Sequence, residues 1–314
     1  KGQTTLPMPA VDFEEANLTQ NRKLMSLLEG AVVTWTKQIK TVLKMDPETM
    51  LKRGENPTPD QELLFWQNKS EHLNSIFKQL QTPSVRKVLR ALDQAKSTYC
   101  TAFARLCKEM FTARMEANDN QKYLRTLTRW FEELNGGVPF VEMKGTFKPM
   151  LHVILLIWKN SRHYNVPARL SVLMREICNA LIAQARAYVT ADQLFEQIEN
   201  ETPDLSIEQL QRTLSICKDF KETFEEYRQT TDTECPNNPW VMNSALFLRL
   251  DAFVDRTNDV LDLVQTIVQF TKLASIEVGG TKGKVLTETV AQVYAAFQDS
   301  VAQMQDVEYD IMDV

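Results

Sequence analysis

Apolar side chains recur every three or four residues along most of this chain, which is the spacing of helices that bury one face. One seam has Thr257 as its single polar member and otherwise comprises Leu246, Leu250, Phe253, Val260, Val264 and Ile267. A second seam comprises Leu286, Val290, Val293, Phe297, Val301 and Met304. A third, closer to a coiled-coil repeat, comprises Ile207, Leu210, Leu214, Cys217, Phe220, Phe224 and Tyr227. These seams predict long amphipathic helices.

Glycine is rare where the helices are expected, and none occurs from Thr146 through Val278. A sheet domain of that length would need glycine turns, whereas helices with short polar links would not. Breaks are predicted at MDPE, RGENPTP, LNGGVPF, TDTECPNNP and VGGTKGK. Helices are expected near 11–44, 59–81, 84–95, 98–134, 148–160, 167–188, 190–199, 206–230, 239–274 and 286–305. The predicted fold class is all-α, an elongated series of stacked helical bundles with antiparallel neighbours.

Three segments carry the side chains that cap helix N-termini. Thr58-Pro59-Asp60-Gln61 combines a capping threonine, a proline at the first helical position and a glutamine that closes a capping box. The same box is predicted where Thr190 is followed by Gln193 and where Ser206 is followed by Gln209. Each leads into apolar residues at helical spacing, so we expect helices to begin there.

Charge is unevenly distributed along the 314 residues, which carry a net charge of −5. Residues 1–160 hold 23 Lys and Arg against 17 Asp and Glu, whereas 161–314 hold 13 against 24. Two interpretations stay open: two solvated surfaces that differ, or halves that attract each other or bind partners of opposite charge. The longest apolar run, Met150–Trp158, has nine residues and is shorter than the about 20 of a membrane helix, so a buried helix is expected.

The five cysteines are odd in number and lack CxxC spacing, which favours a reduced intracellular setting. No signal peptide is expected, because the first ten residues contain no apolar core segment. Since the chain starts at Lys1 and stops without a polar tail, we expect it to be a piece of a longer polypeptide.

The segment SIEVGGTKGKV at 275–285 has the composition of a phosphate-binding loop. A P-loop anchored on Gly283 and Lys284 needs glycine at 278 and serine or threonine at 285, but both positions are valine. We therefore predict an interhelical loop, with Gly279 or Gly280 in the left-handed conformation that ends a helix. Thr281 to Lys284 would form a polar connection, and Thr287 would cap the next helix.

The sequence offers few residues for a catalytic or metal site. There are three histidines, and His152 lies in an apolar segment where a core position is expected. No zinc spacing occurs, and no carboxylate pair stands in an apolar stretch that would separate the two pKa values. The tryptophans are predicted to pack in the core, with interface anchoring as the alternative: Trp35, Trp66, Trp130, Trp158 and Trp240. Basic side chains are spread around their helices and the pI is near 5.5, which argues against nucleic-acid binding.

Several stretches resemble the N-terminal tail of dynein heavy chains, in particular axonemal ones. They are LLEGAVVTWTKQIKTVL (27–43), ELLFWQNKSEHLNSIFKQLQTPSVRKVL (62–89), YLRTLTRWFEEL (123–134), FKPMLHVILLIWKNSRHYNVPARLSVLMREICNALI (147–182) and IEVGGTKGKVL…YDIMDV (276–314). Their order along the chain agrees with the family, and the GGTKGK loop is most similar to outer-arm heavy chains of the beta type. Trp66, Leu73, Ile76 and Leu80 match a family stretch, but their spacing predicts a core.

The resemblance implies a non-catalytic tail segment of a microtubule motor for ciliary or flagellar beating. It implies a lead-in at 1–26 that is partly irregular, a first bundle region at 27–160 and a second at 161–314. Expected partners are other dynein heavy chains, intermediate chains, light chains and docking proteins on doublet microtubules, with no nucleic acid and no membrane. The expected location is the cytoplasm and cytoskeleton, in the axoneme of a cilium or flagellum.

The resemblance implies no catalytic residue, cofactor or metal in this segment. Partner-binding residues do not follow from any motif, and Trp240, Lys282 and Lys284 are the candidates. Two alternative functions stay open: a stand-alone helical adaptor or tethering scaffold, and nucleotide binding at Gly279–Lys284.

Overall fold

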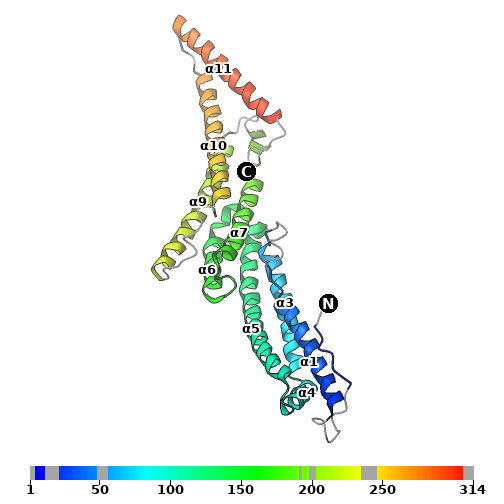
Figure 1. Ribbon diagram of the computed structural model, residues 1–314. Helices are drawn as coiled ribbons and strands as arrows, with labels where there is room; N and C mark the ends of the chain where they lie inside the picture. Colours follow the sequence, from blue (N-terminus) through cyan, green and yellow to red (C-terminus); the bar gives the residue numbers. More distant parts are fainter. Residues whose placement is uncertain are drawn as a thin grey trace. The chain divides into compact units, whose positions relative to one another are not determined.

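The protein is described by a computed structural model, which covers residues 4–10, 21–47, 56–190, 193–194, 196–197, 203–234, 246–276 and 278–306 (Figure 1). In this part of the chain there are nine α-helices and no strand, which confirms the all-α prediction. The helices are α1 (Arg22–Leu43), α3 (Pro59–Leu80), α4 (Pro83–Gln94), α5 (Thr98–Glu132), α6 (Lys144–Asn160), α7 (Pro167–Tyr188), α9 (Pro203–Glu234), α10 (Leu248–Ala274) and α11 (Gly280–Asp306). A π-helical turn (Glu133–Gly137) and a 3-10 turn (Phe140–Glu142) join α5 to α6.

The described chain divides into two compact units that are not contiguous in sequence. Unit 1 comprises 1–129 and 153–172, and unit 2 comprises 130–152 and 173–314. The boundary expected at 160 stays a prediction.

In unit 1, helix α1 packs on α3 and α4. Trp35 on α1 is fully buried, and its ring centre lies 6.0 Å from that of Phe103 on α5. The indole N–H of Trp35 donates a hydrogen bond to the carbonyl of Pro7. Residues 4–10 have no regular structure and are bound to α3: Gln79 accepts from the amide of Leu6 and donates to the carbonyl of Thr4, each at 2.7 Å. An irregular segment is thus held on α3 by side-chain hydrogen bonds.

In unit 2, helices α9 and α10 run antiparallel along their buried seams. Phe247, just before α10, packs against Phe224 at 4.9 Å, and the ion pair Lys221–Asp251 lies one turn further along. The predicted seam of α10 is buried at six of its seven positions, the exception being the half-buried Leu246 before the helix. Thr257 is fully buried, and its hydroxyl donates to the Phe253 carbonyl at 2.7 Å. Local periodicity was enough to predict which face of each helix is apolar, because each helix carries a continuous apolar stripe, but it did not pair the two helices.

Several predicted helix starts are corrected by the structure. Helix α6 begins at Lys144 rather than 148 and holds Pro149 inside, because burial of Phe147 outweighs the preference of proline for the first turn. Helix α11 begins at Gly280 rather than 286. Residues 246 and 247 precede α10 rather than belonging to it, and the expected helical residues 11–20 and 239–245 lie outside the described ranges.

The capping predictions have three different outcomes. The box at Thr58 and Gln61 is confirmed in both directions. At Thr190 the amide of Gln193 donates to the threonine hydroxyl at 3.4 Å, which is half of a box. The box at Ser206 is wrong: α9 starts at Pro203, and the Ser206 hydroxyl instead donates to the side chain of Gln197 at 2.5 Å. Proline at the first helical position sets this start.

Candidate protein-interaction surfaces

The glycine segment before α11 is shorter and more helical than predicted. Gly280 does adopt a left-handed φ of +83°, but it begins α11, whereas α10 ends six residues earlier at Ala274, and its cap residue Ser275 has an ordinary φ. Lys282 and Lys284 are therefore exposed side chains of the first helical turns and not parts of a loop. Thr287 is not a cap either, because its hydroxyl bonds to the Gly283 carbonyl within α11.

The remaining predicted site residues are dispersed. Trp240 lies outside the described ranges. His152 is exposed on α6 rather than in the core, because the inward positions of this helix are taken by its neighbours Leu151 and Ile154. Trp35, Trp66 and Trp158 are buried as predicted, whereas Trp130 is half-buried.

Within the described ranges, no group of three or more His, Cys, Asp or Glu side chains is placed to hold a metal ion. In these described ranges, none of the helices has an apolar stretch of the length that crossing a membrane requires.

Glu62, Trp66 and Tyr164 form a buried polar cluster that the sequence did not predict. Glu62 on α3 is 4% exposed and accepts a hydrogen bond from the hydroxyl of Tyr164, which in turn accepts one from Trp66 Nε1 at 3.0 Å. Burial raises the pKa of Glu62 from 4.5 to about 7, against the opposing effects of the Tyr164 hydrogen bond and the Arg169 charge. Glu62 and Tyr164 lie 102 residues apart, so no local motif could have paired them.

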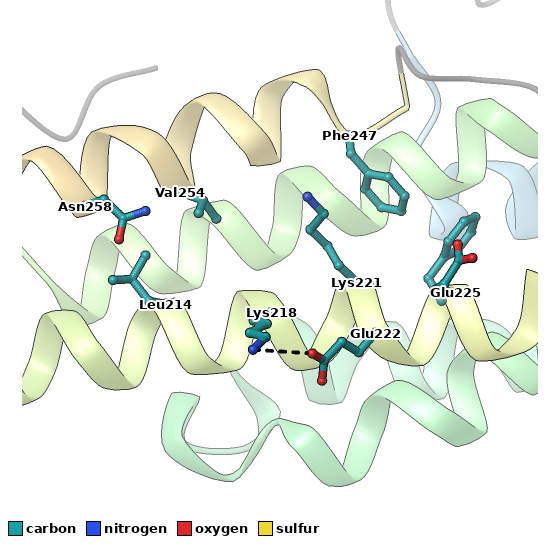
Figure 2. A pocket seen from close by; sticks show the side chains of 9 residues that line it. Leu214, Lys218, Lys221, Glu222, Glu225, Phe247, Val254 and Asn258 are labelled. Atoms are coloured by element: carbon teal, nitrogen blue, oxygen red, sulfur yellow. Dashed lines mark ion pairs between the residues drawn. The ribbon is translucent and has the colours of Figure 1, made fainter.

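A first surface groove lies between α9 and α10, with a volume of about 590 Å3 (Figure 2). Its apolar floor is formed by Leu214, Phe224, Phe247 and Val254. Charges along its rim pair within unit 2: Lys218 with Glu222 at 3.6 Å, drawn as a dashed line in Figure 2, and Lys221 with Asp251. The rim is thus balanced in charge.

A second groove of about 410 Å3 lies among α3, α4 and α5, and we call it the α3–α5 groove. Its lining is mostly apolar and comprises Phe77, Leu80, Gln81, Leu89, Cys107, Lys108, Met110, Phe111 and Thr112. Phe111 and, one turn further, Met115 are each 47% exposed. Large apolar side chains left this open beside a groove are typical of interaction surfaces.

The first turns of α11 extend past the end of α10. Phe270, four residues before the end of α10, stacks on Tyr294, which is fourteen residues into α11. Large apolar side chains around the α10–α11 junction are 41–59% exposed: Leu273 at the end of α10, Ile276 and Val278 between the helices, and Val285, Leu286 and Val293 on α11. The predicted α11 seam is only partly buried.

These features define the class: an α-helical bundle protein that presents apolar grooves between its helices. The family described as "Dynein heavy chain, N-terminal region 1" matches residues 25–314. The chain therefore belongs to the dynein heavy-chain family and corresponds to its N-terminal tail region.

The relatives are axonemal heavy chains. The chain is 42% identical over 323 residues to "Dynein beta chain, flagellar outer arm" of Chlamydomonas reinhardtii. It is 33% identical over 326 residues to "Dynein beta chain, ciliary" of Tripneustes gratilla. It is 34% identical over 317 residues to "Dynein axonemal heavy chain 9" of Homo sapiens. These alignments cover 95–100% of this chain and only 7% of each relative.

Proposed function

We propose that this chain is a non-catalytic stem segment of an axonemal dynein heavy chain, a microtubule motor for ciliary or flagellar beating. Its role is structural: it helps to assemble heavy chains, holds intermediate and light chains, and contributes to anchoring the arm on the doublet microtubule. The location that follows is the cytoskeleton of the cilium or flagellum.

The observation that carries this proposal is similarity along the whole chain to a 7% portion of axonemal heavy chains. The two apolar grooves and the exposed side chains near α11 support a role through protein contacts. A stand-alone adaptor would be expected to resemble short proteins over their full length instead.

The proposal is tested by affinity capture with the tagged 314-residue chain from a ciliary extract, followed by mass spectrometry. We expect recovery of dynein intermediate and light chains in amounts comparable with the bait. A heat-unfolded sample of the same bait serves as the control for adhesion to exposed apolar surface. If the folded chain, verified by circular dichroism, recovers none of these subunits, the proposed docking role is wrong.

Nucleotide binding at Gly279–Lys284 is not favoured by the geometry. Lys284 lies in a helical turn, and Gly283 approaches the carbonyl of Val278 so closely that an added Cβ would meet the oxygen at 2.3 Å. We expect no thermal shift with millimolar Mg-ATP. A shift that disappears in Lys284→Ala would instead establish a nucleotide site.

A further inference from the structure

The α3–α5 groove differs from the α9–α10 groove in the charge around it. All nine residues that line it lie within residues 77–116, a segment with eight Lys and Arg but three Asp and Glu, in a chain whose net charge is −5. One of these carboxylates, Glu109, already pairs with Arg105 at 3.7 Å. Lys108 lies in the apolar lining itself, and the segment that forms the groove carries excess positive charge, so the groove favours an occupant that is both apolar and acidic.

The aromatic end of the groove is held in place by polar contacts. The guanidinium of Arg114 lies 4.0 Å from the centre of the Phe77 ring, and its Nε donates to Asn74 Oδ1 at 2.6 Å. The centres of the Phe77 and Phe111 rings are 5.9 Å apart. Because the guanidinium covers the face of Phe77, that face is not available for stacking on a nucleotide base, which disfavours single-stranded nucleic acid as the occupant.

The shape of the surface favours a helix as the occupant. The walls are helical, so no sheet edge is available for strand addition. Phe111 and Met115 extend the apolar surface by one helical turn along α5, which suits a partner whose apolar side chains recur every three or four residues.

We infer that the α3–α5 groove is a docking site for an acidic amphipathic helix of a partner protein. The apolar face of that helix lies on Phe111, Met115 and the groove floor, and its carboxylates face the basic groups of α3, α4 and α5, among them Lys108. This inference rests on the proposed role in subunit assembly and names the kind of partner that this surface takes.

The test uses two synthetic helical peptides of about 20 residues, each with leucines at every third and fourth position. One carries glutamate at the other positions, and its matched control carries lysine there. We expect the 314-residue chain to bind the acidic peptide at least about ten-fold more tightly than the basic one, as measured by fluorescence anisotropy at about 50 mM salt. Raising the salt to about 300 mM should weaken the acidic complex several-fold.

Two variants place the binding in the groove. Phe111→Ala removes an exposed apolar side chain and Lys108→Glu reverses an exposed charge, so both variants should fold. Each should lower the affinity for the acidic peptide by about ten-fold. The matched controls are Leu248→Ala and Lys272→Glu in unit 2, which also change exposed side chains and should leave the affinity unchanged.

A chemical footprint gives an independent readout. Cys107 lines the groove, and Cys100 lies on the same helix outside it. Alkylation is followed by mass spectrometry at about pH 9, because burial raises the pKa of Cys107 to about 11 and only its thiolate reacts. The acidic peptide should slow alkylation of Cys107 and leave Cys100 unchanged.

The inference is overturned if neither peptide binds, if both bind equally, or if the groove variants bind as tightly as the unchanged chain. It is also overturned if a single-stranded RNA of similar length binds this groove more tightly than the acidic peptide. Peptide binding without capture of dynein subunits would contradict the assembly role alone, and capture without peptide binding would contradict this site alone.

Discussion

Tyr164 donates a hydrogen bond from its hydroxyl to the carboxyl group of Glu62, and both side chains are more than nine-tenths buried in unit 1. This contact joins α3 to the segment that leads into α7. The carboxyl group is kept in the core by two consecutive hydrogen bonds, because Trp66 donates to the same Tyr164 oxygen. Buried polar chains of this kind are costly when one member is removed.

Glu62→Gln should change how stability depends on pH. The pKa of Glu62 is about 7 in the folded chain and near 4.5 in the unfolded chain, so the folded state binds the proton more tightly between these values. Its contribution to the free energy of unfolding is complete below pH 4.5 and is lost as the pH rises through 7, a fall of roughly 3 kcal/mol. Glutamine does not titrate and should remove this fall.

The measurement is urea denaturation at several pH values between 5 and 8, in steps of about one unit. Glu71→Gln, on an exposed position of the same helix, is the matched control and should keep the slope of the unchanged chain. Equal slopes in Glu62→Gln and the unchanged chain would show that Glu62 does not titrate in this range.

Tyr164→Phe should destabilise the fold by about 1–3 kcal/mol, because the indole N–H of Trp66 and the carboxyl group of Glu62 both lose their partner. The loss should be larger at pH 8 than at pH 5, since the Tyr164 hydrogen bond lowers the pKa of Glu62 by favouring the charged form. Tyr227→Phe is the control: its hydroxyl donates to the Lys148 carbonyl at an exposed site, where water replaces it. A pH-independent loss would contradict this account of Tyr164.

Two glycine substitutions should have opposite effects. Gly283→Ala places a Cβ 2.3 Å from the Val278 carbonyl oxygen, so the backbone before α11 has to move and stability should fall. Gly30→Ala lies in α1 with nothing within 4 Å of the new Cβ, and it should stabilise by about 0.5–1 kcal/mol through helix propensity. Thermal melts of both variants check the contrast, and two equal shifts would show that the close approach at Gly283 is not constraining.

In the seam between α9 and α10, Phe253→Ala should cost about 3–5 kcal/mol, because its fully buried ring leaves a cavity. Thr257→Val should change stability by less than about 1.5 kcal/mol: the lost hydroxyl bond goes to the Phe253 carbonyl of its own helix, which is also a helical acceptor. Urea denaturation measures both. A large loss in Thr257→Val would indicate that the hydroxyl has a further structural role.

How far the sequence predicts the fold depends on the distance over which the signal acts. The start of α3 follows from Thr58, Pro59 and Gln61 within four residues, and the buried face of α10 follows from a repeat along one helix. Such features need no knowledge of neighbours, because capping and amphipathic burial are local. The helical class and the resemblance to the dynein tail were accordingly within reach of the sequence.

The sequence by itself determined the helices and which side of each is apolar. Only the tertiary structure decided which apolar surfaces meet: it leaves Leu286 and Val293 half exposed because α11 begins beyond the end of α10, and it turns His152 outward. It also brings the Glu62 carboxyl group within hydrogen-bond distance of the Tyr164 hydroxyl. The α3–α5 groove likewise forms only where three helices meet. These contacts join residues far apart in the chain, and their energies depend on packing that no local pattern encodes.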